Sequence, residues 1–422
     1  MKFVKQENDE VNYLNEDVSV VNMSASTNMM FLPLNSKIGF NGDSIMAEGY
    51  VKNGNTIYYN SQSVASWVML MSNHKMKVPV NGFIATSGFT TMDVLAYIDV
   101  ALALKLDVVV INPGTNDIAL DYTAKNIISH LAQIYAAHIE NGTNIIDLVI
   151  LPRFGAKELT PNQKIQSDLV NQWKRTQTDF QTIVIDPTAK LNASHFYDGL
   201  HPNKYGSKII GGDIATAINS FLVAKGKITD NVRDATNFIK NGIELSGVDG
   251  YMAGGTGQIA TGFNLGVYNL SGVNIVASKE SGEYNDVQAL TISGNYTGEG
   301  DISFNHDATV SLALHDVILG FVDFELVSET HGLKAINLIL NVYDDANNLL
   351  QTAEGFSSSG NNIEIPFDPK RYQMRTPQLF LDVGTPAKIR LILKLIAHTT
   401  NSSESINADI KIYKIGAKKA LV

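Results

Sequence analysis

Two short segments far apart in the chain carry residues that could act together as nucleophile and base. Gly42-Asp43-Ser44 follows a short apolar run, and a serine at the end of a buried strand lies at the sheet edge where α/β folds bind ligands. Asp198 and His201 lie three residues apart, so one loop could hold the carboxylate against the imidazole and set its tautomer. Each motif has an ordinary alternative, since Ser44 could simply cap a helix and the second segment could be a turn.

Two further loops offer groups that could stabilise a negatively charged oxygen. Residues 111–117 follow a predicted strand and place Asn116 at the same sheet edge, where its amide N–H could bind an oxyanion. Gly88, in the loop of residues 85–91, could offer a bare backbone N–H. Singly, each loop is also a common strand-to-helix turn. Together, the four blocks at successive strand ends indicate one catalytic site.

In the order Ser, Gly, Asn and Asp/His, these blocks resemble the SGNH hydrolase family, also called GDSL esterases. The resemblance covers about residues 37–225 and is carried by Gly42-Asp43-Ser44, Gly88, Gly114-x-Asn116-Asp117 and Asp198-x-x-His201. The departures are small. Ile45 stands where many members have Leu, and Ala85-Thr86-Ser87 stands where many have an Asn-Ala-Gly-like start.

The resemblance implies a flavodoxin-like three-layer α/β/α fold with a catalytic triad. Ser44 would be the nucleophile, His201 the general base and then acid, and Asp198 the residue that orients the histidine. The oxyanion hole would consist of the backbone N–H groups of Ser44 and Gly88 and the side chain of Asn116. The supporting residues would be Asp43, Gly114 and Asp117. This chemistry needs neither a metal nor another cofactor.

Hydrophobic periodicity predicts the elements that must position these residues. Short β-branched runs predict strands at residues 36–40, 107–112, 145–151 and 182–185, with a further one near 77–84. Between them, residues 122–140 carry apolar side chains at helical spacing, and Thr160-Pro161 is typical of a helix start. Strands that alternate with helices predict a parallel sheet covered on both faces.

From about residue 246 the pattern turns to strands, which predicts a β-sandwich or jelly roll. The Gly-rich residues 248–266 are predicted as irregular loops. The predicted strands are residues 287–293, 309–314, 317–327, 335–342, 362–365, 378–383, 389–397 and 408–413. The predicted division is an N-terminal arm (1–36), a catalytic domain (37–227), a connecting segment (228–245) and a β-sandwich accessory domain (246–422).

Composition excludes several classes of protein. The 422 residues include no cysteine, which excludes a thiolate nucleophile, disulfides and Cys-based metal sites. The net charge of −10 argues against nucleic acid as a partner, and no apolar run is long enough to span a membrane. His130 and His138 lie eight residues apart on the predicted helix and are interpreted as packing or surface residues. His195, near the proposed site, is interpreted as a surface loop residue.

These observations predict a serine esterase, specifically a carbohydrate O-acetylesterase that acts on an acetylated polysaccharide. The acidic N-terminus lacks the features of a secretory signal, and together with the β-sandwich this suits a phage tailspike. Such a protein would be extracellular or virion-associated and would form a homotrimer. The alternatives are a lipase-like or lysophospholipase-like esterase and a non-catalytic receptor-binding protein or adhesin. The β-domain could bind carbohydrate or serve oligomerisation, since both tryptophans, Trp67 and Trp173, lie in the first domain.

Overall fold

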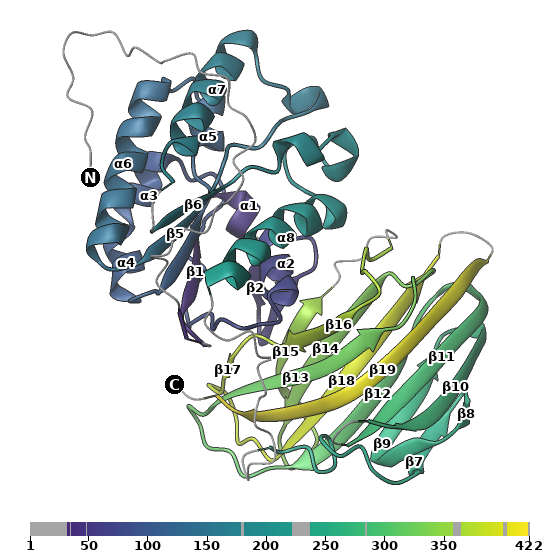
Figure 1. Cartoon of the computed structure of the whole chain (residues 1–422). Helices are drawn as coiled ribbons and strands as arrows, with labels where there is room; N and C mark the ends of the chain where they lie inside the picture. Colours follow the sequence, from purple (N-terminus) through teal and green to yellow (C-terminus); the bar gives the residue numbers. More distant parts are fainter. Residues whose placement is uncertain are drawn as a thin grey trace, which may run out of the picture.

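The structure is a computed structural model that describes residues 32–33, 35–47, 49–178, 181–221, 237–282, 285–357, 364–399 and 403–420. Almost all of the predicted N-terminal arm, and the predicted connecting segment up to residue 236, lie outside the described residues. An α/β domain and a β-sandwich lie side by side (Figure 1). No helix in the described part of the chain is both long and apolar enough to cross a membrane.

A four-stranded parallel sheet forms the centre of the α/β domain. Its order is β1 (Ile38–Asn41), β4 (Val108–Ile111), β5 (Asn144–Leu148) and β6 (Thr182–Ile185). Four of the five predicted strands are thereby confirmed. Because all four run in the same direction, their carboxyl ends meet at one edge, and the loops that follow them meet there too.

Helices cover both faces of this sheet (Figure 1). They are α1 (Ser44–Ala47), α2 (Val64–Met71), α3 (Thr91–Ala96), α4 (Ile98–Ala103), α5 (Thr115–Ala119), α6 (Ala124–Glu140), α7 (Pro161–Arg175) and α8 (Lys204–Phe221). Successive strand residues point to opposite faces, so Val108 and Val110 pack with α2 and α8 while Val109 and Ile111 pack with α6 and α7. The predicted three-layer α/β/α fold is confirmed.

The two helix predictions are confirmed. The predicted apolar face of α6 is buried, including Ile127, Leu131 and Ile134. Thr160 caps α7 by accepting the N–H of Gln163, which completes a capping box, and Pro161 occupies the first helical position.

The fifth predicted strand, residues 77–84, is wrong as a continuous strand. Lys77 forms an isolated parallel bridge to Lys37, the residue before β1, and Phe83 forms one to Phe40 in β1. A turn interrupts the segment between Lys77 and Phe83. Pro79 has no N–H to donate, and its carbonyl accepts the N–H of Gly82. The segment therefore borders β1 without extending the sheet regularly.

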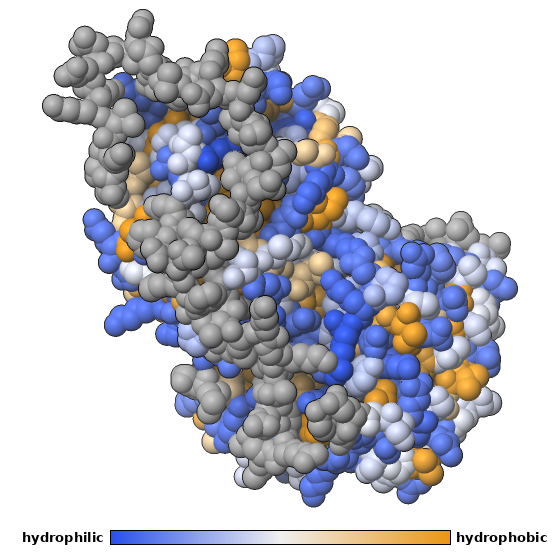
Figure 2. Space-filling model, viewed as in Figure 1, coloured by the Kyte–Doolittle hydropathy of each residue, from blue (hydrophilic) through white to orange (hydrophobic). Residues whose placement is uncertain are grey.

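The second domain is a sandwich of two β-sheets with a large apolar core between them. One sheet has the order β16-β13-β19-β11-β10-β8, with β17 beside β13, and the other has the order β2-β3-β15-β14-β18-β12-β9-β7. The strands from residue 246 onward are β7 (Asp249–Ala253), β8 (Thr256–Gly257), β9 (Ile259–Tyr268), β10 (Ser271–Ser281), β11 (Asp286–Thr297), β12 (Glu299–Thr309), β13 (Val317–Leu326), β14 (Ala335–Tyr343), β15 (Leu349–Ser357), β16 (Arg371–Arg375), β17 (Leu379–Phe380), β18 (Lys388–His398) and β19 (Glu404–Lys419). On the face shown in Figure 2, its surface is mainly hydrophilic with scattered apolar residues.

The predicted all-β character is confirmed, but several limits are wrong. The Gly-rich residues 248–266 form β7, β8 and most of β9, because the backbone hydrogen bonds that pair strands need no apolar pattern. Residues 310–314 lie beyond the end of β12, and residues 378–383 contain only the short β17. The start of the predicted strand 362–365 lies outside the described residues.

A hairpin from the first domain joins the sandwich. β2 (Tyr50–Asn53) and β3 (Thr56–Asn60) pair with each other, and β3 pairs in parallel with β15. The helix that follows, α2, has Val64 and Val68 in the α/β core but Trp67 and Leu70 in the sandwich core. The predicted domain limits stay a prediction, and the structure shows that residues 50–71 belong to both packing units.

Candidate active site

Ser44, His201 and Asp198 lie in hydrogen-bond contact although the serine and the histidine are 157 residues apart in the chain. Ser44 Oγ lies 2.9 Å from Nε2 of His201, and Nδ1 of the same ring lies 2.8 Å from Oδ2 of Asp198. An ionised Asp198 keeps the proton on Nδ1, so that Nε2 accepts the serine hydroxyl proton. The three side chains are thus placed as the predicted roles of nucleophile, base and orienting carboxylate require, and the roles themselves stay predictions.

Hydrogen bonds within the loop that carries Asp198 and His201 hold these two residues in place. Oδ1 of Asp198 accepts the backbone N–H groups of Leu200 at 2.9 Å and of His201 at 2.7 Å. Partial burial alone would raise the pKa of Asp198, but these bonds and the imidazole outweigh it and lower that pKa. The carboxylate is therefore ionised at neutral pH. The ring of Tyr197 stacks on the imidazole at 5.6 Å.

The nucleophile loop is braced by Asp43 and Asn112. Oδ1 of the buried Asp43 accepts the N–H of Ile45 at 3.0 Å and the side-chain amide of Asn112 at 2.8 Å. Burial raises the pKa of Asp43 to about 6, although both hydrogen bonds act against the rise. Gly42 has φ 147°, and a Cβ there would collide with the Asn112 amide, so the close approach requires glycine.

The three predicted oxyanion donors lie at the same sheet edge, where Ser44 begins α1, Gly88 lies on a loop and Asn116 lies in the first turn of α5. Within the described residues, the backbone N–H groups of Ser44 and Gly88 make no hydrogen bond, so both remain available to a ligand. Gly88 has φ 85°, a conformation that favours glycine, and it is exposed. Nδ2 of Asn116 donates to the carbonyl of Phe89 at 2.9 Å, which holds the Gly88 loop and leaves the second amide hydrogen for an oxyanion.

Asp117 and Gly114 support this loop from behind. The buried carboxylate of Asp117 accepts the N–H of Thr91 at 2.9 Å and its hydroxyl at 2.5 Å. These bonds join α5 to the start of α3. Gly114 is the residue before α5 and so sets the point where the helix that carries Asn116 begins.

A buried ion pair lies beneath the same loop. Nζ of Lys174 donates to Oδ1 of Asp147 at 3.0 Å and to the carbonyl of Pro113 at 3.3 Å. Tyr135 donates its hydroxyl to Oδ2 of Asp147 at 2.5 Å. Burial raises the pKa of Asp147, and Lys174 and Tyr135 act against that rise. Sequence analysis did not identify this cluster, since the three residues are far apart in the chain.

Arg153 is a further residue that sequence analysis missed. It follows β5 at the carboxyl edge and donates from Nη2 to the carbonyl and hydroxyl oxygens of Thr115 at 2.5 and 3.0 Å. Burial lowers the pKa of Arg153, and the charge of Asp43 acts against this. The available signal in the sequence was that Arg153, a cationic residue, follows the predicted strand 145–151 and so lies near the carboxyl edge of the sheet.

The remaining histidines lie outside this site. His138 is buried, and burial lowers its pKa to about 4, so it is neutral. His130 contacts the Thr91 hydroxyl through Nδ1 at 3.0 Å, and His195 accepts the N–H of Asn192 at 3.1 Å. No group of three or more metal-ligating side chains is found among the residues that the structure describes.

The family comparison matches the part of the chain that carries this site. A model described as the GDSL-like lipase/acylhydrolase family matches residues 40–209, which include every predicted site residue. A search of curated proteins finds no match.

Solved structures also resemble a part of the chain. Three of them are a GDSL-like lipase from Bacteroides thetaiotaomicron (21% identity, 90% of its length, TM-score 0.34), a member of the lipolytic protein G-D-S-L family from Veillonella parvula (17%, 100%, 0.34) and a carbohydrate esterase family 3 from Talaromyces cellulolyticus (19%, 97%, 0.33). Each match covers 44% of this chain.

Proposed function

We propose that this chain, whose residues 40–209 belong to the GDSL-like lipase/acylhydrolase family of ester-hydrolysing enzymes, is a serine esterase that removes O-acetyl groups from a carbohydrate. The observation that carries the esterase chemistry is the relay from Ser44 Oγ to His201 Nε2 at 2.9 Å and from His201 Nδ1 to Asp198 at 2.8 Å. It provides an activated hydroxyl and a base that is held in the required tautomer.

In the proposed reaction, Ser44 attacks the acetyl carbonyl while His201 takes the hydroxyl proton. The N–H groups of Ser44 and Gly88 and the Asn116 amide hold the oxyanion of the tetrahedral intermediate. His201 then gives its proton to the departing sugar oxygen, which leaves an acetyl group on Ser44. A water molecule, deprotonated by His201, attacks this ester, and acetate and free Ser44 result.

The rim of the site supports a polar alcohol as the leaving group. Thr86 and Ser87 are exposed beside the nucleophile loop, where the N–H of Thr86 donates to the carbonyl of Gly42 at 3.0 Å. Tyr197 is 50% exposed while it stacks on His201. Hydroxyls can bond to the sugar, and an aromatic ring can cover its apolar face. Ser44 itself is only 7% exposed, which suits a small acyl group.

One observation favours a second candidate, a lipase-like esterase. Three exposed apolar residues lie near the Gly88 loop: Met92 on α3, Tyr97 between α3 and α4, and Val100 on α4. The ring of Tyr97 stacks on Phe89 at 5.3 Å. This apolar surface could hold a long acyl chain. Rates on 4-nitrophenyl esters from acetate to dodecanoate separate the two candidates, because an acetylesterase should lose activity steeply as the chain lengthens.

The main test is acetate release from a panel of acetylated bacterial polysaccharides, with the wild type and Ser44→Ala compared. We expect release by the wild type only, with both proteins equally folded. A folded wild type that is inert on these polysaccharides and on 4-nitrophenyl acetate would instead support the non-catalytic adhesin.

The proposed substrate also suggests where the protein acts. Capsule and O-antigen lie outside the cell, so we propose an extracellular or virion-associated enzyme, with a trimeric tailspike as the specific hypothesis. An SDS-resistant trimer would support the tailspike. A monomer that lacks activity on every bacterial polysaccharide would count against it.

A further inference from the structure

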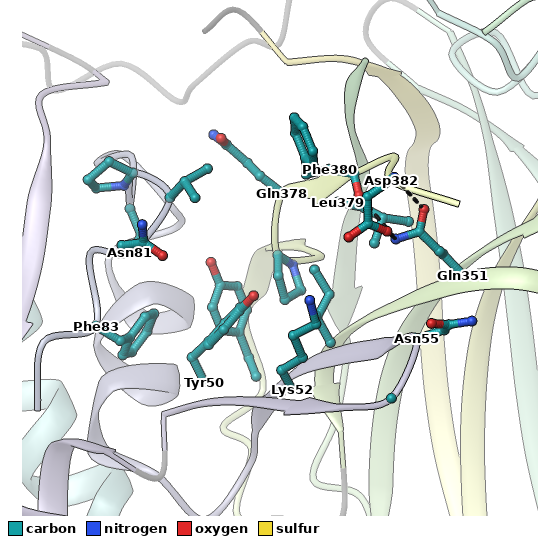
Figure 3. Close-up of a pocket in the computed structure, with 17 residues that line it drawn as sticks. Tyr50, Lys52, Asn55, Asn81, Phe83, Gln351, Gln378, Leu379, Phe380 and Asp382 are labelled. Atoms are coloured by element: carbon teal, nitrogen blue, oxygen red, sulfur yellow. Dashed lines mark hydrogen bonds between the residues drawn. The ribbon is translucent and has the colours of Figure 1, made fainter. Parts of the chain in front are cut away.

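A cavity of about 340 Å³ lies between the two domains, and none of the triad residues lines it. We call it the seam cavity. Its floor is the β2–β3 hairpin, one wall is residues 78–83, and the opposite wall is residues 377–382 of the sandwich (Figure 3). This volume is typical of small-ligand sites, which often lie between domains.

Aromatic rings line both sides of the seam cavity. Tyr50 and Phe83 stack on each other at 5.5 Å on the side of the first domain. Phe380, on the facing wall, is 42% exposed and stacks on His315 at 5.4 Å. Phe83 also stacks on Phe40 at 5.0 Å. The half-buried Tyr50 and the exposed Phe380 are therefore the rings that could offer a free face to the apolar face of a sugar.

Polar side chains reach the same space. Lys52, Asn81 and Gln378 line the cavity (Figure 3), and their side chains make no hydrogen bond or ion pair with any residue in the described ranges. Asp382 accepts a hydrogen bond from Gln351 at 2.8 Å. Donors and acceptors of this kind can pair with sugar hydroxyls. An acyl chain would instead desolvate them without replacing their water.

We infer that the seam cavity is a saccharide-binding site that anchors the polysaccharide on the enzyme while its acetyl ester is hydrolysed at Ser44. The inference rests on the proposed carbohydrate esterase function. Both walls are needed, because the aromatic rings and the amides are divided between the domains. The fused hairpin and α2 hold these walls together, so the site is preformed.

The test uses Ser44→Ala as the parent protein, so that bound esters are not consumed. The probes are purified bacterial capsule and O-antigen polysaccharides on a printed array, each in native and alkali-deacetylated form. The tightest binder is then titrated in solution. We expect Phe380→Ala and Lys52→Ala each to weaken binding about tenfold or more, with and without acetyl groups. Tyr251→Ala, an aromatic that is 67% exposed on β7, is the matched control.

Lys52 lies on the exposed hairpin, so Lys52→Ala tests the site even if Phe380→Ala fails to fold. Near-ultraviolet circular dichroism shows whether each variant is folded. Unchanged binding in the two cavity variants, or loss only in Tyr251→Ala, overturns the inference. So does a parent protein that binds no polysaccharide. Acetate release by the wild type is measured separately. If the wild type releases acetate but the cavity variants bind the polysaccharide normally, only the role of the seam cavity is refuted. If the cavity variants lose binding but the wild type releases no acetate, only the esterase proposal is refuted.

Discussion

The catalytic edge of the α/β domain and the seam with the β-sandwich are held together in different ways. At the edge, Ser44 and Asn116 lie a few residues after the ends of β1 and β4. Short polar contacts, such as those of Asp43 and Asp198, fix the loops of this edge. At the seam, Trp67 is fully buried against Phe356 and Phe367, with ring centroids 4.8 and 5.6 Å away. The edge therefore depends on the placement of polar groups, and the seam depends on apolar burial.

The largest expected effect is at the catalytic edge. His201→Ala should lower kcat on 4-nitrophenyl acetate by about 10⁴–10⁶-fold, because neither nucleophile nor leaving group then has its proton carrier. The stability of the protein should hardly change, since the side chain of His201 is partly exposed to solvent. His331→Ala, an exposed histidine of the sandwich, is the control. A loss below tenfold would refute the assigned role.

The next effect belongs to the seam. Trp67→Ala should lower the free energy of unfolding by about 3–5 kcal/mol, because it empties a buried site that both domains share. Guanidinium unfolding followed by fluorescence and by activity measures this. Trp173 is half-buried on α7, so Trp173→Ala should lower the free energy of unfolding by less than Trp67→Ala does. If Trp67→Ala destabilised only one domain in a separate transition, the seam would not be a common packing unit.

Asn116→Ala tests the oxyanion hole. We expect kcat/KM to fall about 10²–10³-fold, the usual effect of losing one such donor. Asn126→Ala, on the exposed side of α6, is the matched control and should be near wild type. A rise in KM with an unchanged kcat would indicate that Asn116 only holds the Phe89 carbonyl.

Asp43→Asn tests a buried charge beside the nucleophile. Its folded pKa of about 6 exceeds the ordinary 3.8, so the folded state holds the proton more tightly and stability falls as pH rises from about 4 to 6. Both side-chain hydrogen bonds use Oδ1, which asparagine retains. The variant should therefore be more stable than the wild type at pH 8, by about 2–3 kcal/mol. Urea unfolding at pH 4 and pH 8 checks this, and a stability gain that is larger at pH 4 would contradict it.

The smallest effect is expected for the ion pair that crosses the seam. Lys208 lies 2.5 Å from Asp368, but both side chains are partly exposed to solvent. Lys208→Ala should lower the free energy of unfolding by no more than about 1 kcal/mol, and by less in high salt because salt screens the two charges. Unfolding at two salt concentrations measures it. A cost equal to that of Trp67→Ala would show that charge, as well as apolar burial, holds the domains together.

Much of the catalytic edge could be predicted because its information is local. A buried β-branched run followed by Gly42-Asp43-Ser44 predicts both a strand and the residue at its end, and Asp198-x-x-His201 predicts a self-contained loop. The structure places these residues together, while their catalytic roles stay predictions. Arg153, Lys174 and Asp147 could not be predicted, because their partners come from other strands and helices.

The sequence by itself determined the fold class, the order of the catalytic blocks and the all-β character of the second part. Periodicity and motif spacing encode these features within short windows of the chain. Only the tertiary structure decided that β2 and β3 join a sheet of the sandwich, that α2 packs in the cores of both domains, and that a cavity forms beside the hairpin. The reason is physical: strand pairing and shared burial depend on which surfaces meet, and the hairpin pairs with β15 almost 300 residues further along the chain.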